Sequence, residues 1–382
     1  MLNEINKLKA QGYNSICFWL PALNIGGGNY AFVQMINSIV KNSDINIYYC
    51  DFKDGYATYL LKNNKKVKII EYKENDLVFP LKEKTIIITN STRPIQITKM
   101  NPNNKIILWH YETTLCAWNI VFLDDETKSF FKLVNETKCM TYIDWGAKNS
   151  IEKQLNISLA ETPYIPITLE PHNKIELANT NLINKNEINI CWLSRLALEK
   201  VQALYYLIEN ISNYKTNKKI NFHIIGDGIK AKEVQEFVKI YRNINFIFTS
   251  TLLLDDMREY LIKNVDLLFC MGASVLEGAA LKIPSVGLLL DDYGKKINSE
   301  YAFWLFDSSD YCTAIMQYQT NEFNGKLTKI KDMLDLIYNN SENKQIYGNK
   351  CYEHYIKYHS SYYEASKNLL KVANNSLYVI HI

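Results

Sequence analysis

The feature that most constrains the fold is an alternation of short apolar runs with longer amphipathic stretches. In the first half of the chain the apolar runs are 15–20, 45–50, 67–72, 85–89, 105–110 and 138–143, and in the second they are 188–194, 220–226, 244–249, 265–270 and 284–290. Between them lie helical patterns, for example 201–211 with apolar positions at Val201, Leu204, Tyr205, Ile208 and Ile211. Strands bounded by helices, twice over, predict an α/β chain with two doubly wound parallel sheets.

The length of 382 residues suits two domains. Residues 162–187 contain three prolines and many asparagines without periodicity, so the connection between the domains is expected there. We predict an N-terminal Rossmann-like domain at 1–170, a linker at 171–187 and a second domain at 188–352. Residues 353–382 form a C-terminal helical segment that could pack on either domain, and we expect the N-terminal one.

The charge balance, the apolar windows and the cysteines disfavour several classes of protein. Lys and Arg number 43 against 40 Asp and Glu, and this balance disfavours bulk nucleic-acid binding. The polar N-terminus shows no signal peptide, and charged residues interrupt the most apolar window, 265–290, so no membrane span is expected. The eight cysteines form no C-x-x-C pair, and Cys17, Cys191 and Cys270 lie in apolar runs. These observations predict a reduced, cytoplasmic chain without a metal cage.

A glycine-rich stretch, "PALNIGGGNYAFVQ" at 21–34, follows the first apolar run. Gly26-x-Gly28-x-x-Ala31, with Asp51 further on, matches the dinucleotide fingerprint. In that fingerprint, however, the first glycine follows the strand almost directly, whereas residues 21–25 intervene here. An NAD site is therefore disfavoured, and Asp51 is interpreted as a residue at the end of the second strand.

Cations follow the first strand of the second domain. Arg195 and Lys200 lie five positions apart at a strand-to-helix junction, in "SRLALEK". There the two side chains, the free backbone N–H groups and the helix dipole could converge on a diphosphate. The alternative is that both are solvated residues of the first helical turn.

Two further strand ends in this domain carry candidate residues. Gly226, Asp227 and Gly228 follow one strand, where glycines permit either an ordinary turn or close approach of a ligand. After another strand, Gly272 precedes Ser274-x-x-Glu277. This spacing fits a helix capping box, but a carboxylate there could also bind the vicinal hydroxyls of a ribose.

Taken in order, "RLALEK", "IIGDG" and "DLLFCMGASVLEGAALKIPSV" resemble the donor domain of GT-B glycosyltransferases, especially the family-4-like enzymes. In the first domain, "GGGNYAFVQMINSIV", "YIDWGAKNSIEKQL" and "YIPITLEP" are similar to its acceptor-side elements, so the resemblance covers about residues 14 to 290. It implies two Rossmann-like domains facing across a cleft. It also implies a sugar transfer from a nucleotide diphosphate sugar to a hydroxyl acceptor.

The resemblance assigns roles to individual residues. Arg195 and Lys200 would hold and neutralise the donor diphosphate, and Glu277 would bind the ribose. The glycines and their neighbours (Gly27, Gly28, Gly226, Asp227, Gly228, Gly272 and Ser274) would belong to the donor site. His110, which ends a strand, matches a histidine near the transferred sugar, where it could bond the sugar or act as a general base; a structural role is the alternative.

One position departs from the family pattern. Many family-4 enzymes have a second glutamate eight residues before the ribose-binding one, and here that position is Phe269. Retention or inversion at the anomeric carbon therefore stays open. The acidic pairs Asp124-Asp125, Asp255-Asp256 and Asp291-Asp292 are interpreted as solvated loop or helix-cap carboxylates, and no metal or other cofactor is expected to be required.

The predicted function is glycosyl transfer to a glycan or lipid-linked acceptor. A nucleotide-sugar epimerase of the same fold and a non-catalytic nucleotide-sugar-binding partner subunit are the alternatives, and the missing second glutamate supports the latter. Basic aromatic segments at 7–13 and 350–359 hint at peripheral contact with the inner face of a membrane, although they equally fit solvated surfaces. No nucleic-acid partner is expected.

Overall fold

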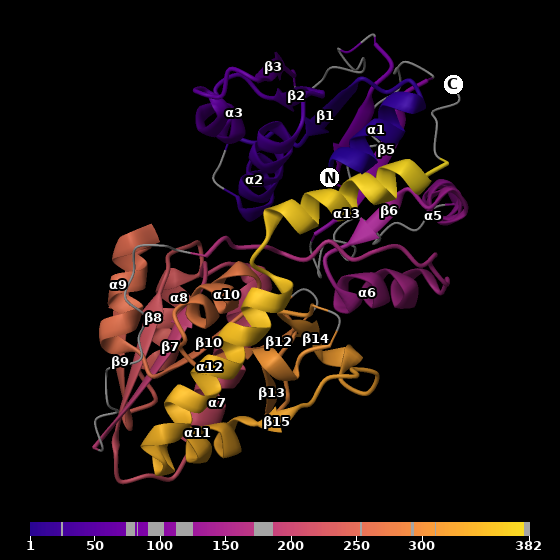
Figure 1. The fold of residues 1–382 in the computed structure, drawn as a ribbon. Helices are drawn as coiled ribbons and strands as arrows, with labels where there is room; N and C mark the ends of the chain where they lie inside the picture. Colours follow the sequence, from indigo (N-terminus) through magenta and orange to yellow (C-terminus); the bar gives the residue numbers. More distant parts are fainter. Residues whose placement is uncertain are drawn as a thin grey trace. The chain divides into compact units, whose positions relative to one another are not determined.

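The computed structural model describes residues 1–23, 26–73, 81, 83–90, 103–111, 125–171, 186–252, 254–291, 294–309 and 311–377 (Figure 1). The chain divides into two compact units. Unit 1 comprises Met1–Thr168 and Ser361–Ile382, and unit 2 comprises Leu169–Ser360. The C-terminal segment from Ser361 onward thus belongs to the N-terminal unit, and most of the predicted linker, 172–185, lies outside the described residues.

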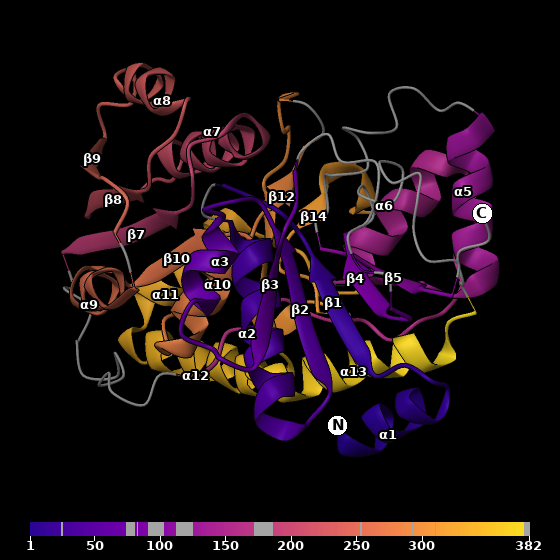
Figure 2. The same ribbon diagram turned by 90° about the horizontal axis from the view of Figure 1, so that it is seen from above.

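Unit 1 is built on a six-stranded sheet with the order β3-β2-β1-β4-β5-β6, in which every pairing is parallel. Figure 2 shows β3, β2, β1, β4 and β5 side by side. Its strands are β1 (Ser15–Trp19), β2 (Asn46–Asp51), β3 (Val67–Glu71), β4 (Ile86–Thr89), β5 (Lys105–His110) and β6 (Met140–Tyr142). The chain order reverses between β1 and β4, and this switch point is where ligands of open α/β sheets bind.

The helices of unit 1 connect and cover this sheet. They are α1 (Leu2–Ala10), α2 (Gly27–Asn42), α3 (Tyr56–Leu61), α5 (Asp125–Thr137), α6 (Trp145–Leu155) and, from the end of the chain, α13 (Tyr362–Asn375). The last of these, α13, packs against α1, α2 and β5, so that the first and the last helix lie on the same face of the sheet (Figures 1 and 2).

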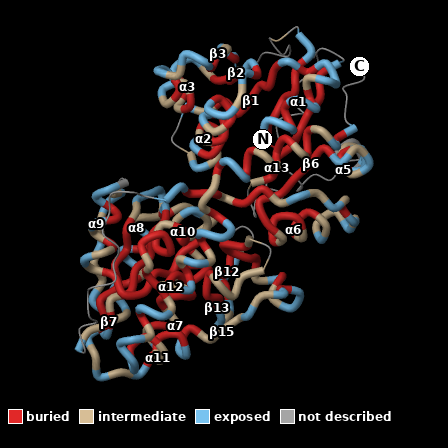
Figure 3. The backbone as a smooth tube through the Cα atoms, in the orientation of Figure 1, coloured by how far each residue is buried: buried red, intermediate tan, exposed pale blue. Residues whose placement is uncertain are grey.

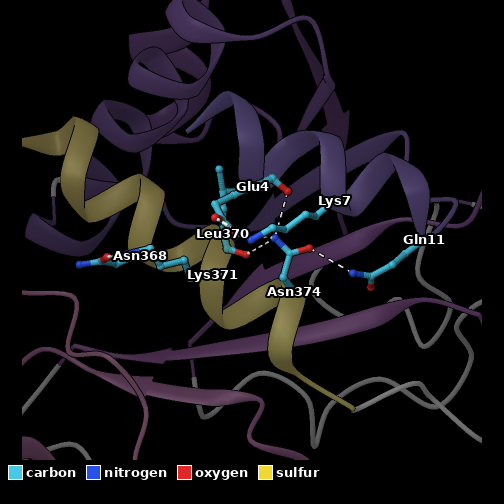
Figure 4. A network of polar contacts seen from close by, with 7 residues as sticks. All are labelled: Glu4, Lys7, Gln11, Asn368, Leu370, Lys371 and Asn374. Carbon is cyan, nitrogen blue, oxygen red and sulfur yellow. Dashed lines mark hydrogen bonds and ion pairs between the residues drawn. The ribbon is translucent and has the colours of Figure 1, made fainter.

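A polar network joins α13 to α1 (Figure 4). Asn374 Nδ2 donates to the backbone oxygen and to Oε2 of Glu4, both at 3.0 Å, and Asn374 Oδ1 accepts from Gln11 Nε2 at 3.1 Å. Gln11 in turn accepts from the buried Lys105, whose Nζ also donates to the carbonyl of Ala373 at 3.0 Å. Burial lowers the pKa of Lys105, and the nearby Lys84 lowers it further. Each buried polar group here has a partner, which is the condition for burying it without a large penalty.

Unit 2 is built on a seven-stranded sheet with the order β15-β13-β11-β10-β7-β8-β9. The strands of this sheet are β7 (Glu187–Leu193), β8 (Lys219–Ile225), β9 (Ile244–Thr249), β10 (Leu267–Cys270), β11 (Ser285–Gly287), β13 (Tyr301–Trp304) and β15 (Thr328–Lys329). A separate parallel pair is formed by β12 (Leu289–Leu290) and β14 (Ile315–Met316). In the main sheet the order reverses between β7 and β10, which places a second switch point there.

The helices of unit 2 cover both faces of its sheet. They are α7 (Leu198–Ser212), α8 (Ala231–Val238), α9 (Leu254–Asn264), α10 (Ala273–Ala280), α11 (Ile330–Asn339) and α12 (Ser341–Tyr358), with short 3-10 helices η2 (Leu305–Asp307) and η3 (Gln317–Gln319). Right-handed crossovers place α7 and α8 on one face and α9 and α10 on the other. Contacts agree with this arrangement, since the ring of Tyr205 in α7 lies tilted against that of Phe237 in α8, with ring centroids 4.1 Å apart.

A polar ladder crosses unit 2 near the amino ends of its strands. Asn245 donates to Asn221, Asn221 to Asn189, and Asn189 to Asp266, each at 2.9 Å. Asp266 is also paired with Lys344 of α12 at 2.6 Å, and both side chains are more than nine-tenths buried. The ladder fixes the register of four strands at the sheet edge opposite to their carboxyl ends.

The predicted strands are all present, and their apolar side chains form the core of each unit (Figure 3). The cysteines of the described residues are buried thiols, as predicted for Cys17, Cys191 and Cys270. One difference concerns the second sheet, which is not wholly parallel. Strands β13 and β15 were not predicted, and β13 pairs antiparallel with both β11 and β15.

Candidate functional site

The sequence motifs of unit 2 meet at the switch point between β7 and β10. Residues 194–200 follow β7, residues 226–230 follow β8, and residues 271–277 follow β10. Because these neighbouring strands are parallel, their carboxyl ends lie at one edge of the sheet. The structure thus brings together the segments of unit 2 that contain the predicted donor residues.

Lys200 is directed toward the end of the sheet. Its Nζ donates to the Oγ of Ser194 at 2.9 Å, and Ser194 is buried. Burial raises the pKa of the Cys270 thiol at the end of β10. Lys200 lies close enough to this thiol to lower its pKa in part. The ammonium group is therefore held at the β7–β10 switch point.

Arg195 behaves differently from Lys200. Its side chain is 72% exposed, and Nη2 makes a long ion-pair contact with Glu199 Oε1 at 3.4 Å. An exposed pair of this kind contributes little to stability. The two cations therefore do not converge on one point in this structure. Both belong to the same strand-to-helix junction: Arg195 precedes α7, and Lys200 lies in its first turn.

The glycines after β8 have a packing role. A β-carbon on Gly226 would lie 2.1 Å from the carbonyl oxygen of Ser194, and one on Gly228 would lie 2.4 Å from that of Leu196. Both residues also have positive φ. Asp227 between them is exposed, and its carbonyl accepts from Leu196 N at 2.9 Å. The glycines allow this loop to pack on the loop after β7, which accounts for them without a ligand.

Gly272 has the clearest conformational requirement. It is the N-cap residue of α10 with φ 63° and ψ −142°, a region that only glycine adopts readily. A β-carbon there would meet nothing within 4 Å. Ser274 is the second residue of the helix, and the N-cap makes no side-chain hydrogen bond, so the capping-box interpretation of Ser274 and Glu277 is wrong.

Glu277 is instead paired with an arginine that the sequence did not reveal. Arg258 of α9 donates from Nε to Glu277 Oε2 at 3.1 Å and from Nη2 to Oε1 at 3.2 Å. The arginine side chain is 5% exposed and the glutamate side chain 14%. Nineteen positions separate the two residues, and nothing in the sequence around Arg258 distinguishes it from a solvated arginine on an amphipathic helix.

In unit 1, Asp51 has a structural role that leaves no room for the dinucleotide interpretation. It is buried at the end of β2, and its carboxylate accepts from the backbone N–H groups of Ala22, Phe52 and Thr58 and from the Thr58 hydroxyl, at 2.9–3.1 Å. These four hydrogen bonds occupy the acceptor positions of a carboxylate. Asp51 therefore anchors the loop after β1 instead of offering its oxygens to a ribose.

The glycines of unit 1 lie at the start of α2, beside the other switch point. Gly26 is the N-cap residue, so no side chain caps the first turn of α2. A β-carbon on Gly27 would meet nothing within 4 Å, whereas one on Gly28 would lie 2.8 Å from the ring of Tyr111. Gly27 thus borders open space in this structure, and Gly28 is required by the packing of Tyr111.

His110 ends β5 and is completely buried. Its ring lies edge-on to that of Tyr142, with centroids 6.4 Å apart, and its carbonyl accepts from Ile143 N. The side chain reaches no solvent in this structure. Its catalytic role therefore stays a prediction, beside the structural alternative.

Of the three acidic pairs, Asp255-Asp256 is the one that lies wholly within the described residues. Asp255 lies in the first turn of α9, where it is 86% exposed and contacts Arg258. Asp124 and Asp292 lie outside the described residues. Within the ranges given above, no three His, Cys, Asp or Glu side chains gather into a set that could bind a metal ion.

A comparison of the sequence with protein-family models and with curated proteins finds no match. Solved structures, in contrast, are similar over most of the chain. HepE from Anabaena, in complex with UDP and glucose, has a TM-score of 0.57 at 10% identity and covers 94% of this chain and 99% of its own.

Two further structures have the same extent of similarity. A glycosyltransferase from Rickettsia africae has a TM-score of 0.58 at 13% identity and covers 94% of this chain and 96% of its own. The E. coli trehalose-6-phosphate structure with UDP-2-fluoro glucose has a TM-score of 0.58 at 10% identity and covers 94% of this chain and 99% of its own. With two doubly wound units and similarity over nearly its whole length, the chain has the GT-B fold.

Proposed function

We propose that the protein is a glycosyltransferase that moves a sugar from a nucleotide diphosphate sugar to a hydroxyl group of a glycan or lipid-linked acceptor. The observation that carries this proposal is that the segment with Arg195 and Lys200 follows β7 and the segment with Glu277 follows β10, the two strands at the switch point of unit 2. A ligand with a diphosphate and a ribose would find cations for the first and a carboxylate for the second at this one edge.

The cations have the largest role in the proposed reaction. An acceptor oxygen attacks the anomeric carbon, the bond from that carbon to the diphosphate oxygen breaks, and its electron pair remains on the leaving diphosphate. Lys200 and Arg195 would stabilise that charge, together with the N-terminal N–H groups of α7 and α10. Arg195 is exposed and only weakly paired, so it can turn toward a bound diphosphate at little cost.

The remaining donor residues would hold the nucleotide. Glu277 would accept hydrogen bonds from the ribose hydroxyls, and Gly272, with open space beside its Cα, would let the diphosphate approach the start of α10. Ser274, Asp227 and the two glycines beside it are further donor candidates. In unit 1, Gly27 and Gly28 are proposed for ligand approach and His110 for the acceptor proton or the sugar.

The structural neighbours support a uridine nucleotide as the first donor to test, because HepE was solved with UDP and the E. coli structure with UDP-2-fluoro glucose. The cations and helix ends would neutralise the leaving group without a metal ion, so we propose a metal-independent reaction.

We further propose that the protein works in the cytoplasm, in contact with the inner face of a membrane. Among the residues that the structure describes, no helix combines the length and the apolar character that a bilayer crossing requires. The support for surface contact is the segment 350–359, where Lys350 and Lys357 lie over aromatic rings and Ile356 is 39% exposed.

The test is a thermal-unfolding screen of the full chain with nucleoside diphosphates and their sugars, followed by an assay of nucleoside diphosphate release. Stabilisation by one nucleotide and its sugar, with release that depends on added acceptor, is expected for a transferase. Conversion of the donor without acceptor would indicate an epimerase. Binding without turnover would indicate a non-catalytic partner subunit.

A further inference from the structure

We infer that Arg258 is a positioning residue for the donor site: it holds the carboxylate of Glu277 in the orientation that receives the ribose hydroxyls. This inference rests on the proposed function, because it assigns a role to Arg258 through a ribose-binding Glu277. No sequence motif marks Arg258, which follows the first turn of α9.

The contact between the two residues is bidentate. Nε and Nη2 of Arg258 each donate to a different oxygen of Glu277, at 3.1 and 3.2 Å. A planar guanidinium that meets a carboxylate in this way fixes both the position and the plane of the carboxylate. A lysine at this position could supply the positive charge but could not fix the plane of the Glu277 carboxylate.

The guanidinium is itself held in place. Its third donor group, Nη1, bonds to Asp255 Oδ1 at 3.0 Å, and its side chain is 5% exposed. Tyr355 of α12 lies near enough to feel both charges: burial raises the pKa of its hydroxyl, Glu277 raises it further and Arg258 lowers it. The Tyr355 hydroxyl donates to the carbonyl of Leu169 at 2.7 Å, which holds this tyrosine in place.

The helix that contains Glu277 has little freedom to move. A β-carbon on the next residue, Gly278, would lie 2.4 Å from the Leu268 side chain and 2.5 Å from Ser285 Oγ, so α10 packs closely on β10 and β11. With its backbone fixed by this packing and its carboxylate fixed by Arg258, Glu277 presents a preorganised acceptor.

The fork of Arg258 by itself does not use the full acceptor capacity of the Glu277 carboxylate. A carboxylate has about four acceptor positions, and the fork of Arg258 uses one on each oxygen. The remaining lone pair of each oxygen lies in the plane that Arg258 fixes, so the direction from which a ribose hydroxyl can donate is also fixed. Because Arg258 sets this plane, its loss should weaken recognition of the ribose and leave recognition of the diphosphate largely intact.

The experiment measures ribose recognition by calorimetry on the full chain. The diphosphates of uridine, guanosine, adenosine, cytidine and thymidine are titrated first, and the tightest is then compared with its 2′,3′-dideoxy analogue. Wild-type protein should prefer the natural nucleotide by roughly tenfold or more for each hydrogen bond lost to a charged group. In Arg258→Lys and Arg258→Met this preference should fall to near unity, while affinity for inorganic pyrophosphate changes less than about threefold.

Two further variants separate positioning from folding. Lys344→Met breaks another buried ion pair of unit 2, with Asp266 at the amino end of β10, and should lower the melting temperature without changing the ribose preference. The double variant Arg258→Met/Glu277→Gln removes both charges and so avoids an unpaired buried carboxylate. It should fold, and its ribose preference should equal that of Glu277→Gln alone.

The two proposals fail in different ways. If the wild-type protein binds none of the five diphosphates, both the proposed function and this inference are overturned. If it binds one and discriminates against the dideoxy analogue, but folded Arg258→Lys discriminates equally well, only the role of Arg258 is overturned.

Discussion

The ammonium group of Lys200 lies 2.9 Å from the hydroxyl of Ser194, and this contact fixes the cation at the carboxyl end of β7. If Lys200 stabilises the leaving diphosphate, Lys200→Met should lower kcat by about 100-fold or more, the usual cost of removing one transition-state donor. The methionine keeps the aliphatic stem, so the free energy of unfolding should fall by only about 1 kcal/mol.

The matched control for that variant is Lys218→Met. Lys218 also makes one short hydrogen bond, to the Tyr338 carbonyl at 2.6 Å, but precedes β8 at the opposite edge of the sheet. Its kcat should equal that of the wild type. Equal kcat values in both variants would remove Lys200 from the mechanism.

The close approach of Gly28 to Tyr111 predicts a coupling between the two positions. Gly28→Ala should destabilise unit 1 by roughly 1–3 kcal/mol, because the new methyl group would lie 2.8 Å from the ring. Tyr111→Leu shortens that side chain and should recover most of the loss in the double variant. Gly27→Ala, with open space around it, should leave stability nearly unchanged. Urea unfolding of the four variants tests this, and strictly additive effects would contradict the packing explanation.

Asn374 should contribute strongly to the attachment of α13. Asn374→Leu removes its hydrogen bonds to Glu4 and Gln11 and leaves the buried Glu4 carbonyl without that donor, at a cost of about 1–3 kcal/mol. The neighbouring Asn375 is exposed, so Asn375→Leu should change stability by no more than about 0.5 kcal/mol. Equal unfolding midpoints for the two variants would refute a structural role for the network.

The histidine pair near the end of α12 predicts a loss of stability in acid. The pKa of His354 is lowered to about 3, mainly by burial and in addition by the nearby His359 and Lys357. The unfolded chain binds this proton below about pH 6.5 while the folded chain does not, so stability is complete above that pH and is lost as the pH falls. Between pH 6.5 and 5 the loss from this group should be roughly 1–2 kcal/mol.

Urea unfolding at several pH values checks this prediction. Burial also lowers the pKa of His223, so the wild-type slope contains more than one contribution. The difference between wild type and His354→Gln isolates the contribution of His354 to the slope of stability against pH. The variant should lose less stability toward pH 5. Identical slopes would show that His354 is protonated in the folded state.

Apolar periodicity was sufficient to predict most of the fold. Most strands of the two parallel regions are buried on both faces and therefore stand out as continuous apolar runs, whereas the outer strands β3 and β9 are partly exposed. Strands β13 and β15 escaped prediction because they are short and β15 is only partly buried, so neither gives a clear period. Their pairing, β13 with β11 and β15 with β13, depends on tertiary contacts that no local pattern encodes.

The site was only partly predictable, for a related reason. A residue at a strand end can be located from the sequence, but its partners come from other elements. The four donors around Asp51, the ring over Gly28 and the arginine that holds Glu277 all depend on tertiary contacts. Consequently the sequence located the segments of the donor site and missed Arg258.

The central claim is that unit 2 binds a nucleoside diphosphate through the cations after β7. Its most direct test is the thermal stability of the full chain with saturating UDP, or with whichever diphosphate binds best, in wild type and in Arg195→Ala. Arg242→Ala, another exposed arginine ahead of β9 at the opposite sheet edge, is the matched control. We predict stabilisation of about 2.7 kcal/mol at a ligand concentration 100 times Kd in wild type and Arg242→Ala, and a clearly smaller value in Arg195→Ala. No stabilisation by any diphosphate, or equal stabilisation of all three proteins, would contradict the claim.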